Sequence, residues 1–366
     1  MRVACVICES HNLVALYTLP GHPITPSSNN RTENTDIYAD CRFVGCTDCG
    51  CVQLETLIDP VLLYGEAHNN TFDTPTWKAH HMGFADFIKS TFTGDSILEV
   101  GGSSGILYKM GHFSPEMNVT IMDICDNPKR DSTLKFVQGN CEEFDYSGYS
   151  CVVLSHTFEH LYSPRRFIER LQRGRVESVY ISIPNMEHLY DTKNISILHN
   201  EHTYFIDTDT MISLFSQFNY SCKGVSKFKS HSTFFHFRYD TSILPLALPR
   251  EMKYILSIPS IFREYEEKMA NIDISGPCFI CPGGHYGQKI YYYLKSRARN
   301  IVGFIDNDVT KQGKRVYGTK CITYAPSILS AYGGKSVQIL LYAGPYTEEL
   351  KAQLSNIYPL LKYIDI

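Results

Sequence analysis

The chain lacks the long apolar segments that insertion into a membrane requires. None of its hydrophobic runs approaches the roughly 18–20 residues of a spanning helix. The N-terminal sequence, MRVACVICESHN, does not provide an export signal, because Glu9 and His11 interrupt its apolar run. Internal repeats and low-complexity tracts are also missing, which leaves ordinary globular domains. We therefore expect a cytoplasmic protein that is not associated with a membrane, in a compartment where thiols stay reduced.

A surplus of positive charge is missing as well. The chain has 34 Lys and Arg against 38 Asp and Glu, and the basic residues are spread along it rather than clustered. Binding of nucleic acids depends on neutralising phosphates with clustered cations, so the charge argues against a nucleic-acid partner. With 366 residues the chain has room for two or three domains. We expect a monomer or a small homo-oligomer.

Cysteine is concentrated at the N-terminus. Six of the 13 cysteines lie in the first 51 residues, at positions 5, 8, 41, 46, 49 and 51. Clustered cysteines in a reducing compartment are more often metal ligands than disulfide partners. Cys5 with Cys8 and Cys46 with Cys49 both have C-x2-C spacing, and four such thiolates close a tetrahedral structural zinc site. Either remaining cysteine could replace a member of the second pair, although the spacing favours the two pairs.

The middle of the chain alternates between short β-branched runs and helical patterns, which is typical of a parallel sheet flanked by helices. The predicted strands are SILEVG (96–101), VTIMDI (119–124), LKFVQ (134–138), CVVLS (151–155) and VESVYISI (176–183). The predicted helices include 163–173 and 207–218, each preceded by a polar residue that could cap it. Runs 221–229 and 232–239, separated by a two-residue turn, predict an antiparallel hairpin. Five parallel strands followed by such a pair are the strand set of class I methyltransferases.

Composition divides the chain into four parts. We assign 1–60 to a zinc-binding module, 61–240 to the cofactor domain, 241–275 to a linker and a helix, and 276–366 to a second Rossmann-like domain. The prolines of 240–260 (Pro245, Pro249 and Pro259) predict the linker, which the charged helix 261–269 follows. In the last part we expect a strand at 278–281, a turn at 282–284, a helix at 285–298 and a strand at 301–306. The predicted fold is thus α/β, with a class I methyltransferase (Rossmann-like) sheet, an N-terminal zinc-ribbon module and a C-terminal second α/β domain.

A glycine-rich turn follows the first predicted strand of the cofactor domain. Such a turn lets a ligand approach the backbone closely at the strand end where α/β sheets bind nucleotides. Dinucleotide sites have G-x-G-x-x-G, whereas this chain has E-x-G-G-x-x-G, the first motif of methyltransferases. The pattern predicts an S-adenosylmethionine site. Its residues in this turn are Glu99, Gly101, Gly102, Ser103 and Gly105.

Polar side chains end the following strands. Asp123 stands at the end of the second strand, where a carboxylate accepts hydrogen bonds from both ribose hydroxyls, although an acid here could instead cap a helix. Asn140 follows the third strand, where a polar side chain commonly meets the adenine amino group. Ser155 ends the fourth strand and completes the predicted cofactor residues.

Two histidine-containing motifs follow the fourth and fifth strands, SHTFEH (155–160) and HNEHTYF (199–205). All these strand ends face the cofactor edge, where a methyl acceptor must lie. Imidazole is the usual general base near neutral pH, and a neighbouring carboxylate fixes its tautomer. The motifs therefore predict an acid–base site. We interpret His156 and His188 as structural residues.

The chain resembles the zinc-containing methyltransferases that act on nucleotide-linked sugars, best known as sugar C-3 methyltransferases of deoxysugar pathways. The resemblance covers nearly the whole chain. It comprises the first cysteine pair, Gly21-His22-Pro23, the second pair continuing into Cys51-Val52-Gln53-Leu54, LEVGGSSG, SHTFEH, ISIPN, NEHTYF, PGGHYG (282–287), FIDND (304–308), and Lys311-Gln312-Gly313 followed by Gly318.

This resemblance implies a function. It implies C-methylation of a 4-keto nucleotide sugar, with His202 as the general base and with Glu201 and His160 close to the sugar. It also implies that the C-terminal domain lines the nucleotide-sugar pocket and does not bind NAD. Two segments depart from the family: 65–77 contains no tyrosine where the family is tyrosine-rich, and His199 stands where a tyrosine is more familiar. Both border the acceptor, so we include His199 among the catalytic candidates.

Three alternatives stay open. The first is a sugar O-methyltransferase that again uses His202 as base. The second is a zinc-ribbon nucleic-acid methyltransferase. Such an enzyme needs a stripe of basic residues and usually has a motif such as N-P-P-Y at the position where this chain has SHTF. The third is a non-catalytic binder with two Rossmann-like units, because Gly283, Gly284 and Gly287 with Asp306 imitate part of a dinucleotide fingerprint.

Overall fold

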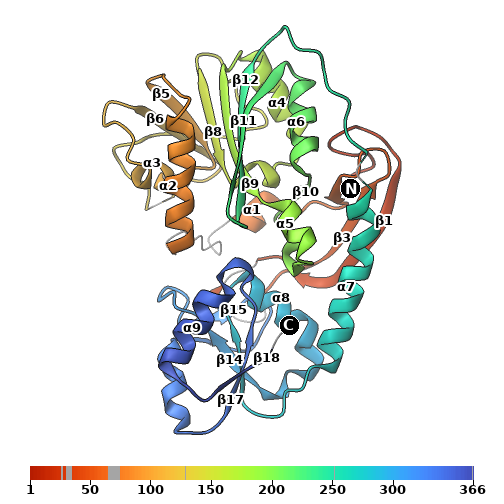
Figure 1. Cartoon of the computed structure of the whole chain (residues 1–366), viewed down its shortest axis with the longest axis vertical. Coiled ribbons are helices and arrows are strands. Elements are labelled where there is room, and N and C mark those ends of the chain that lie inside the picture. The colour runs from red at the N-terminus through yellow and green to blue at the C-terminus, as the bar shows by residue number, and fades with distance from the viewer. Residues whose placement is uncertain (26–27, 30–34, 65–74, 128, 251, 365) are drawn as a thin grey trace.

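A seven-stranded sheet forms the core of the larger lobe in this computed structural model (Figure 1). The structure describes the chain except for residues 26–27, 30–34, 65–74, 128, 251 and 365. The strands are β5 (Ser96–Val100), β6 (Asn118–Asp123), β7 (Lys135–Gln138), β8 (Cys151–Ser155), β9 (Ser178–Pro184), β11 (Tyr220–Phe228) and β12 (Ser232–Tyr239), in the spatial order β11-β12-β9-β8-β5-β6-β7. The strands β5 to β9 pair in parallel, and β12 inserts antiparallel between β9 and β11. This is the strand order of class I methyltransferases.

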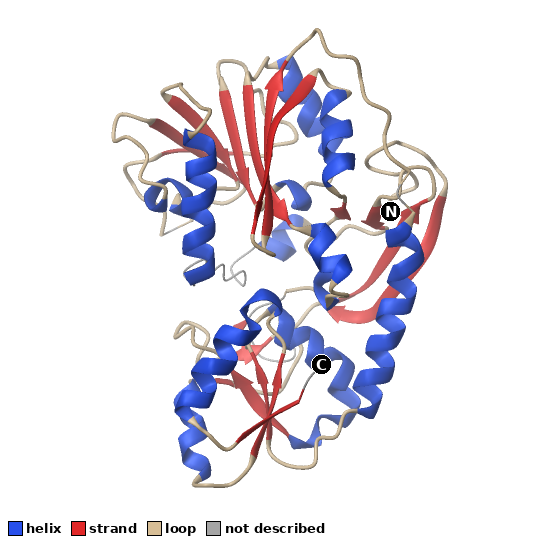
Figure 2. Ribbon diagram, viewed as in Figure 1, coloured by secondary structure: helices blue, strands red, loops and turns tan. Residues whose placement is uncertain are grey.

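Helices cover both faces of this sheet, as Figure 2 shows. One face packs on α2 (Pro75–Lys89) and α3 (Ile106–Met110), and the other packs on α4 (Pro164–Arg173) and α6 (Thr208–Ser216). Neighbouring residues of a strand serve opposite faces, so Ile97 packs toward α2 and Leu98 toward α4. Because both faces are covered, the strands are apolar on both sides, which explains their near-continuous hydrophobic runs.

The predicted strands and helices of this domain match the structure to within two residues at nearly every end. Two details were wrong. The β11–β12 hairpin has three residues between its strands rather than two, and Lys229 there adopts a left-handed backbone conformation with φ 51°. Ser163 makes no capping hydrogen bond through its side chain, whereas Asp207 accepts one from the Thr210 N–H as expected.

The N-terminal residues form a second, four-stranded sheet of antiparallel pairs with the order β1-β3-β4-β10. Its strands are β1 (Leu13–Pro23), β3 (Tyr38–Cys46), β4 (Val52–Leu54) and β10 (Tyr204–Phe205). The last strand belongs to the predicted cofactor domain and follows the Asn-Glu-His run after one residue, Thr203. The cysteine-containing segment and the histidine motif therefore share one sheet.

The C-terminal residues form a five-stranded parallel sheet in the lower lobe of Figure 1, with the order β16-β14-β13-β17-β18. Its elements are β13 (Cys278–Cys281), α8 (His285–Leu294), β14 (Ile301–Ile305), β16 (Thr323–Tyr324), β17 (Val337–Leu341), α9 (Thr347–Ile357) and β18 (Leu361–Ile364). This parallel sheet with helices α8 and α9 is an α/β arrangement of the kind expected for 276–366. Its first helix is shorter than expected, because residues Lys295–Asn300 continue as a 3-10 helix.

The predicted linker at 240–260 is partly wrong. Helix α7 (Lys253–Asn271) begins eight residues before the expected start at 261, and Pro259 lies inside it. Its side chains at helical spacing, among them Ile255, Ile258 and Phe262, are buried and pack with residues of the N-terminal sheet. A proline costs a helix one backbone hydrogen bond, and the buried apolar face offsets that cost.

Short elements connect the lobes. Strand β2 (Ser28–Asn29) pairs with β15 (Arg315–Val316), and Arg315 forms a bidentate ion pair with the buried Asp36 at 2.6 and 2.7 Å. The remaining helical segments near the site are α1 (Pro60–Tyr64), η2 (Phe158–His160), α5 (Met186–Asp191) and η3 (Ile195–Ile197). Among the described residues, no helix is both long and apolar enough to cross a membrane.

Candidate functional site

The predicted cofactor turn directly follows β5. Gly101 and Gly105 have φ angles of 71° and 73°, a left-handed conformation that glycine adopts at little cost. A Cβ atom on Gly101 would lie 2.4 Å from Oγ1 of Thr157, and one on Gly102 would lie 2.8 Å from Cδ of Glu99. The glycines therefore allow the turn to pack closely on the strand ends, as the sequence pattern predicted.

The turn meets the end of β6. The Ser103 N–H donates to Oδ2 of Asp123 at 3.2 Å, and the Ile124 N–H donates to Oδ1 at 2.8 Å. The Asn127 amide donates to the Ser103 hydroxyl at 2.7 Å. The chain winds from β5 to β6 on one side and returns through β8 on the other, so the turn and Asp123 lie at the switch point of the sheet.

Glu99 lies beneath this turn and is only 4% exposed. Burial, and after it the charge of Asp123, raises the pKa of Glu99 to about 8. Two carboxyl groups that repel each other at one edge favour a ligand with positive charge. The acid of the E-x-G-G-x-x-G motif is thus an electrostatic feature of the site as well as a packing partner of Gly102.

The other two predicted cofactor residues end neighbouring strands. Asn140 follows β7, is exposed, and its Oδ1 accepts a hydrogen bond from the Glu142 N–H at 3.0 Å. Ser155 ends β8, and its buried hydroxyl has no hydrogen-bond partner among the described residues. The structure therefore places all the predicted cofactor residues at the carboxyl ends of β5, β6, β7 and β8.

The two histidine motifs meet at the same edge of the sheet. Glu159, His160 and His202 each place a ligand-type atom within 4.8 Å of the others, and the two imidazole ring centres are 4.9 Å apart. The Thr203 N–H donates to the Glu159 carbonyl at 3.0 Å, which joins the segments through the backbone. Glu159 and His202 line a small recess together with apolar side chains such as Phe158. Residues 42 positions apart in the sequence thus form one polar group beside an apolar recess.

His202 is held neutral in this group. Burial, followed by the positive charge that His160 would carry, lowers the pKa of His202 well below its usual value. A neutral imidazole can accept a proton at neutral pH. Burial also raises the pKa of Glu159 to about 7.

The C-terminal domain supports the segment before His202. The His199 ring lies between those of His202 and His285, with centres 4.6 and 3.8 Å away, and its Nδ1 accepts a hydrogen bond from the Glu201 N–H at 3.0 Å. Lys289 of α8 donates to the carbonyls of Ile195, at 2.7 Å, and Leu198. Burial lowers the pKa of Lys289 to about 7. The four predicted catalytic residues therefore lie where the central domain, the N-terminal sheet and helix α8 of the C-terminal domain meet.

Asp306 does not present a free carboxylate in the second Rossmann-like domain. It accepts a hydrogen bond from the Gly283 N–H at 3.1 Å and pairs with Lys311 at 3.1 Å. A dinucleotide fingerprint would use Asp306 to bind a ribose. The structure instead pairs Asp306 with Lys311, a residue that has no role in the dinucleotide interpretation. This contact argues against NAD in the C-terminal domain.

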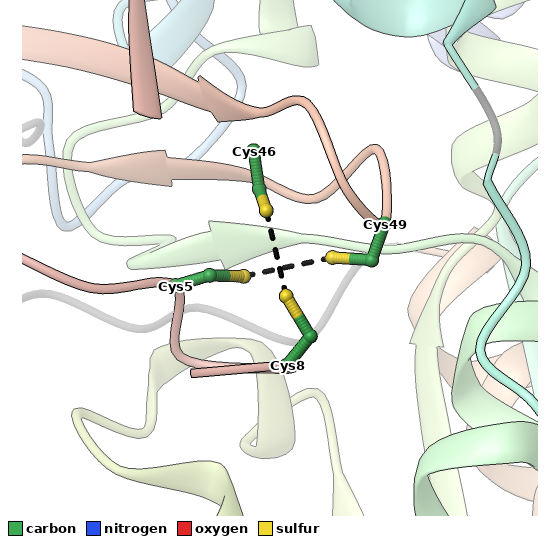
Figure 3. A group of neighbouring side chains, drawn as sticks. All are labelled: Cys5, Cys8, Cys46 and Cys49. Atoms are coloured by element: carbon green, nitrogen blue, oxygen red, sulfur yellow. Dashed lines mark hydrogen bonds between the residues drawn. The ribbon is translucent and has the colours of Figure 1, made fainter. Parts of the chain in front are cut away.

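The four predicted cysteine ligands converge from two loops, as Figure 3 shows. Sulfur atoms of Cys5 and Cys49 are 3.6 Å apart, those of Cys8 and Cys46 are 3.4 Å apart, and all four lie within 4.8 Å of one another. Tetrahedral zinc with bonds of about 2.3 Å places its sulfurs about 3.8 Å apart, so the donor set and spacing fit this ion. The hydrogen bond from Cys49 lowers the pKa of Cys5, which favours the thiolate form that binds metal.

Sequence reasoning missed several residues of this region. The Tyr64 hydroxyl lies 2.8 Å from Nδ1 of His160, directly before the segment 65–77. Most of that segment, 65–74, lies outside the described residues, and 75–77 begin α2. His156, which we had interpreted as structural, places Nδ1 3.2 Å from Oε1 of Glu159. No motif signalled Tyr64, because its contact with His160 spans 96 residues.

Comparisons with known proteins are limited to the fold. No family model and no curated protein sequence matches the chain. The methyltransferase domain of bacterial CtHen1-C is 15% identical with a TM-score of 0.37, over 45% of this chain and 100% of that one. CurJ carbon methyltransferase is 11% identical with a TM-score of 0.38, over 46% and 56% of the two chains. Magnesium protoporphyrin IX methyltransferase from Synechocystis, solved with S-adenosylhomocysteine, is 14% identical with a TM-score of 0.35, over 48% and 91%.

Glu99 makes the stability of the protein depend on pH. Because its pKa is raised, the Glu99 carboxyl stays neutral in the folded protein up to about pH 8, whereas in the unfolded chain it loses its proton near pH 4.5. The stability that Glu99 gives to the folded state is therefore fully present below about pH 4.5 and is lost as the pH rises through about 8. Over that window the free energy of unfolding should fall by up to about 1.4 kcal/mol per pH unit more in the wild type than in Glu99→Gln. Denaturant unfolding at pH 5, 7 and 9 measures this difference.

Glu116→Gln is the matched control, because Glu116 is exposed just before β6. It should leave the slope of the wild type unchanged. Parallel curves for Glu99→Gln and the wild type would contradict the buried, protonated state of Glu99.

Proposed function

We propose that this protein is an S-adenosylmethionine-dependent methyltransferase. The observation that supports this most directly is the joint placement of the E-x-G-G-x-x-G turn and Asp123 at the switch point of a sheet with the class I methyltransferase strand order. When bound, S-adenosylmethionine supplies an electrophilic methyl group. The residues present fit its chemistry, because its amino and sulfonium groups are positively charged and the edge presents the Asp123 carboxyl, with Glu99 buried beside it.

Each polar residue of this edge has a role in the proposal. Asp123 accepts hydrogen bonds from the ribose hydroxyls, and Asn140 contacts the adenine amino group. Glu99 supports the glycine turn and favours the positively charged methionine end. Ser155 offers a buried hydroxyl that has no hydrogen-bond partner among the described residues.

The proposed acceptor is a nucleotide-linked sugar with a ketone, methylated on the neighbouring carbon. His202 accepts the proton from that carbon, and the resulting carbanion is the nucleophile for the methyl group. His160 and Glu201 bind the sugar near this base, and His199 holds the segment in place through its contact with His285. Support comes from the neutral state of His202, from the adjoining recess and from the second Rossmann-like domain, whose Lys289 contacts the histidine segment. Orientation of the base and carbon against the methyl group would provide much of the rate enhancement.

Methyl transfer to a sugar hydroxyl is the second candidate. The chain has His199 where the resembling family has tyrosine, and this ring lies 4.6 Å from His202. A changed residue beside the proposed base favours a different acceptor position on the same class of substrate. In that case His202 accepts a hydroxyl proton.

We propose that the cysteine cluster binds one structural Zn²⁺ ion. Four thiolates leave no open coordination position, so the ion stabilises the fold rather than taking part in the reaction. It would fix the ends of β3 and of the N-terminal turn. Those elements in turn position β4, which pairs with β10 next to His202.

Loss of one cysteine ligand should remove this zinc. Because binding of metal to a closed thiolate site is coupled to folding, Cys8→Ser should lower the zinc content by one equivalent per chain and yield little soluble protein. Cys41→Ser is the control, since Cys41 is buried in the same sheet but lies outside the cluster. Elemental analysis measures the content, and a soluble Cys8→Ser protein with the zinc content of Cys41→Ser would refute the assignment.

Asp123→Ala tests the cofactor site. The variant leaves two ribose hydroxyls without a charged acceptor, so binding of S-adenosylhomocysteine should weaken by about 1.5–3 kcal/mol, or about 10–150-fold. Asp126→Asn, an exposed carboxyl three residues away, should bind like the wild type. Titration calorimetry measures both, and equal affinities in the wild type and Asp123→Ala would remove Asp123 from the site.

Deuterium exchange distinguishes carbon from oxygen as the acceptor. With S-adenosylhomocysteine bound, the wild type should exchange one substrate C–H for deuterium, because His202 can remove that proton without methyl transfer. His202→Asn should lose exchange and turnover together, by about 10²–10⁴-fold, and keep its cofactor affinity. Mass spectrometry follows the exchange on a panel of dTDP-, UDP-, GDP- and CDP-linked 4-keto sugars. Turnover to an acid-stable methyl ether without exchange would contradict C-methylation and favour the second candidate.

A further inference from the structure

Three histidines outside the predicted site form a cluster of their own. His80 lies on α2, His156 follows β8, and His231 lies in the loop between β11 and β12. Each offers one ring nitrogen, and these atoms lie within 4.8 Å of one another. The ring centres form a nearly equilateral triangle with sides of 5.0, 5.2 and 5.3 Å. Residues from three separate elements thus converge on one point.

The size of this triangle matches a metal site. With metal–nitrogen bonds of about 2.0–2.1 Å and tetrahedral angles, three ligating imidazoles have ring centres about 5 Å apart. Three histidines with a fourth, open position are an established donor set for Zn²⁺. The observed distances between the ring centres therefore already match those of a metal site.

His80 keeps one ring nitrogen available for an ion. Its Nδ1 is buried without a hydrogen-bond partner among the described residues. A buried polar atom without a partner is uncommon in folded proteins, and a bound ion would satisfy it.

Oxygen atoms hold the rings in place. Nε2 of His80 lies 2.9 Å from the Ser182 hydroxyl, and the Ser232 hydroxyl lies 2.8 Å from Nε2 of His156 and 2.5 Å from Nδ1 of His231. Metal-binding histidines almost always have such a partner on one ring nitrogen, which orients the ring. The other nitrogen of His156, Nδ1, lies 3.2 Å from Oε1 of Glu159. His231 is half-buried in a hairpin loop.

We propose that His80, His156 and His231 bind a divalent transition-metal cation of the Zn²⁺ class, leaving one coordination position open. This site is separate from the cysteine cluster and does not depend on the proposed methyltransferase activity. His156 lies 3.2 Å from Glu159, which lines the recess beside His202, so the cluster adjoins the same edge of the sheet. An oxygen atom of a bound molecule or water would complete the coordination.

Trp77 provides a direct probe of this site. It is the only tryptophan of the chain, and its ring centre lies 5.2, 4.9 and 4.6 Å from those of His80, His156 and His231. A paramagnetic ion such as Co²⁺ bound among these rings should therefore quench the fluorescence of the indole. Figure 1 draws α2 and the N-terminal sheet on opposite sides of the seven-stranded sheet, so Co²⁺ at the cysteines would not produce this signal.

The experiment titrates CoCl₂ into full-length protein that retains one equivalent of zinc, so that the cysteine cluster stays occupied. The wild type should show saturable quenching with one equivalent of Co²⁺, and prior addition of Zn²⁺ should prevent it. His231→Gln and His80→Gln should raise the Kd for Co²⁺ by more than about 100-fold, since loss of even an outer partner of a ligand costs about 10–100-fold. His236→Gln is the matched control, because His236 is a buried histidine of β12 that stacks on Tyr180 outside the cluster.

The outcomes decide the proposal. Quenching in the wild type and in His236→Gln, with loss in His231→Gln, supports the site, and zinc content should then fall by one equivalent in His231→Gln while the cysteines remain occupied. Absence of quenching in the wild type, or equal Co²⁺ affinity in His231→Gln, would show that the rings are only packed against Trp77. If His80→Gln does not fold, His231→Gln decides alone, since its side chain lies in a half-buried loop.

Discussion

The pairing of β10 with β4 is the interaction on which the proposed site depends. It joins Tyr204 and Phe205, which follow His202 after one residue, to the sheet that ends in the cysteine cluster. Arg2 strengthens the junction by donating to the Thr203 carbonyl at 2.5 Å and to the Tyr162 carbonyl at 2.8 Å. From the opposite side, Lys289 holds the carbonyls that precede His199. The N-terminal and C-terminal modules therefore both position one short segment of the central domain.

Desolvation gives this edge of the sheet its chemistry. Burial raises the pKa of Glu99 and Glu159 and lowers that of His202, so these groups are shifted toward their neutral forms. A neutral imidazole can accept a proton, and the proposed function relies on this property at His202. The carboxylate of Asp123 favours a positively charged cofactor at the other end of the same edge. The shifted pKa values of these groups thus follow from their burial away from water, and the proposed function depends on them.

Sequence pattern was sufficient for the elements whose signals are local. The strands of the cofactor domain, the C-terminal strands at 278–281 and 301–306, the glycine turn and the two C-x2-C pairs are each encoded in consecutive residues. The structure has them within a few positions, whereas β16, β17 and β18 were not predicted. The start of α7 was missed because Pro259 indicates a loop, whereas the helix gains its stability from packing on the N-terminal sheet. Strand β10 has two residues and a partner about 150 positions earlier, so no local pattern could reveal it. The cluster of His80, His156 and His231 likewise exists only through the tertiary fold.

The central claim is that the glycine turn and Asp123 bind S-adenosylmethionine rather than a dinucleotide. The most direct test is titration calorimetry of the purified, full-length protein with S-adenosylhomocysteine and, separately, with NADH. This account predicts saturable binding of one S-adenosylhomocysteine per chain, a rise in melting temperature with that ligand, and neither effect with NADH. Binding of NADH without binding of S-adenosylhomocysteine would contradict the proposed function as a whole.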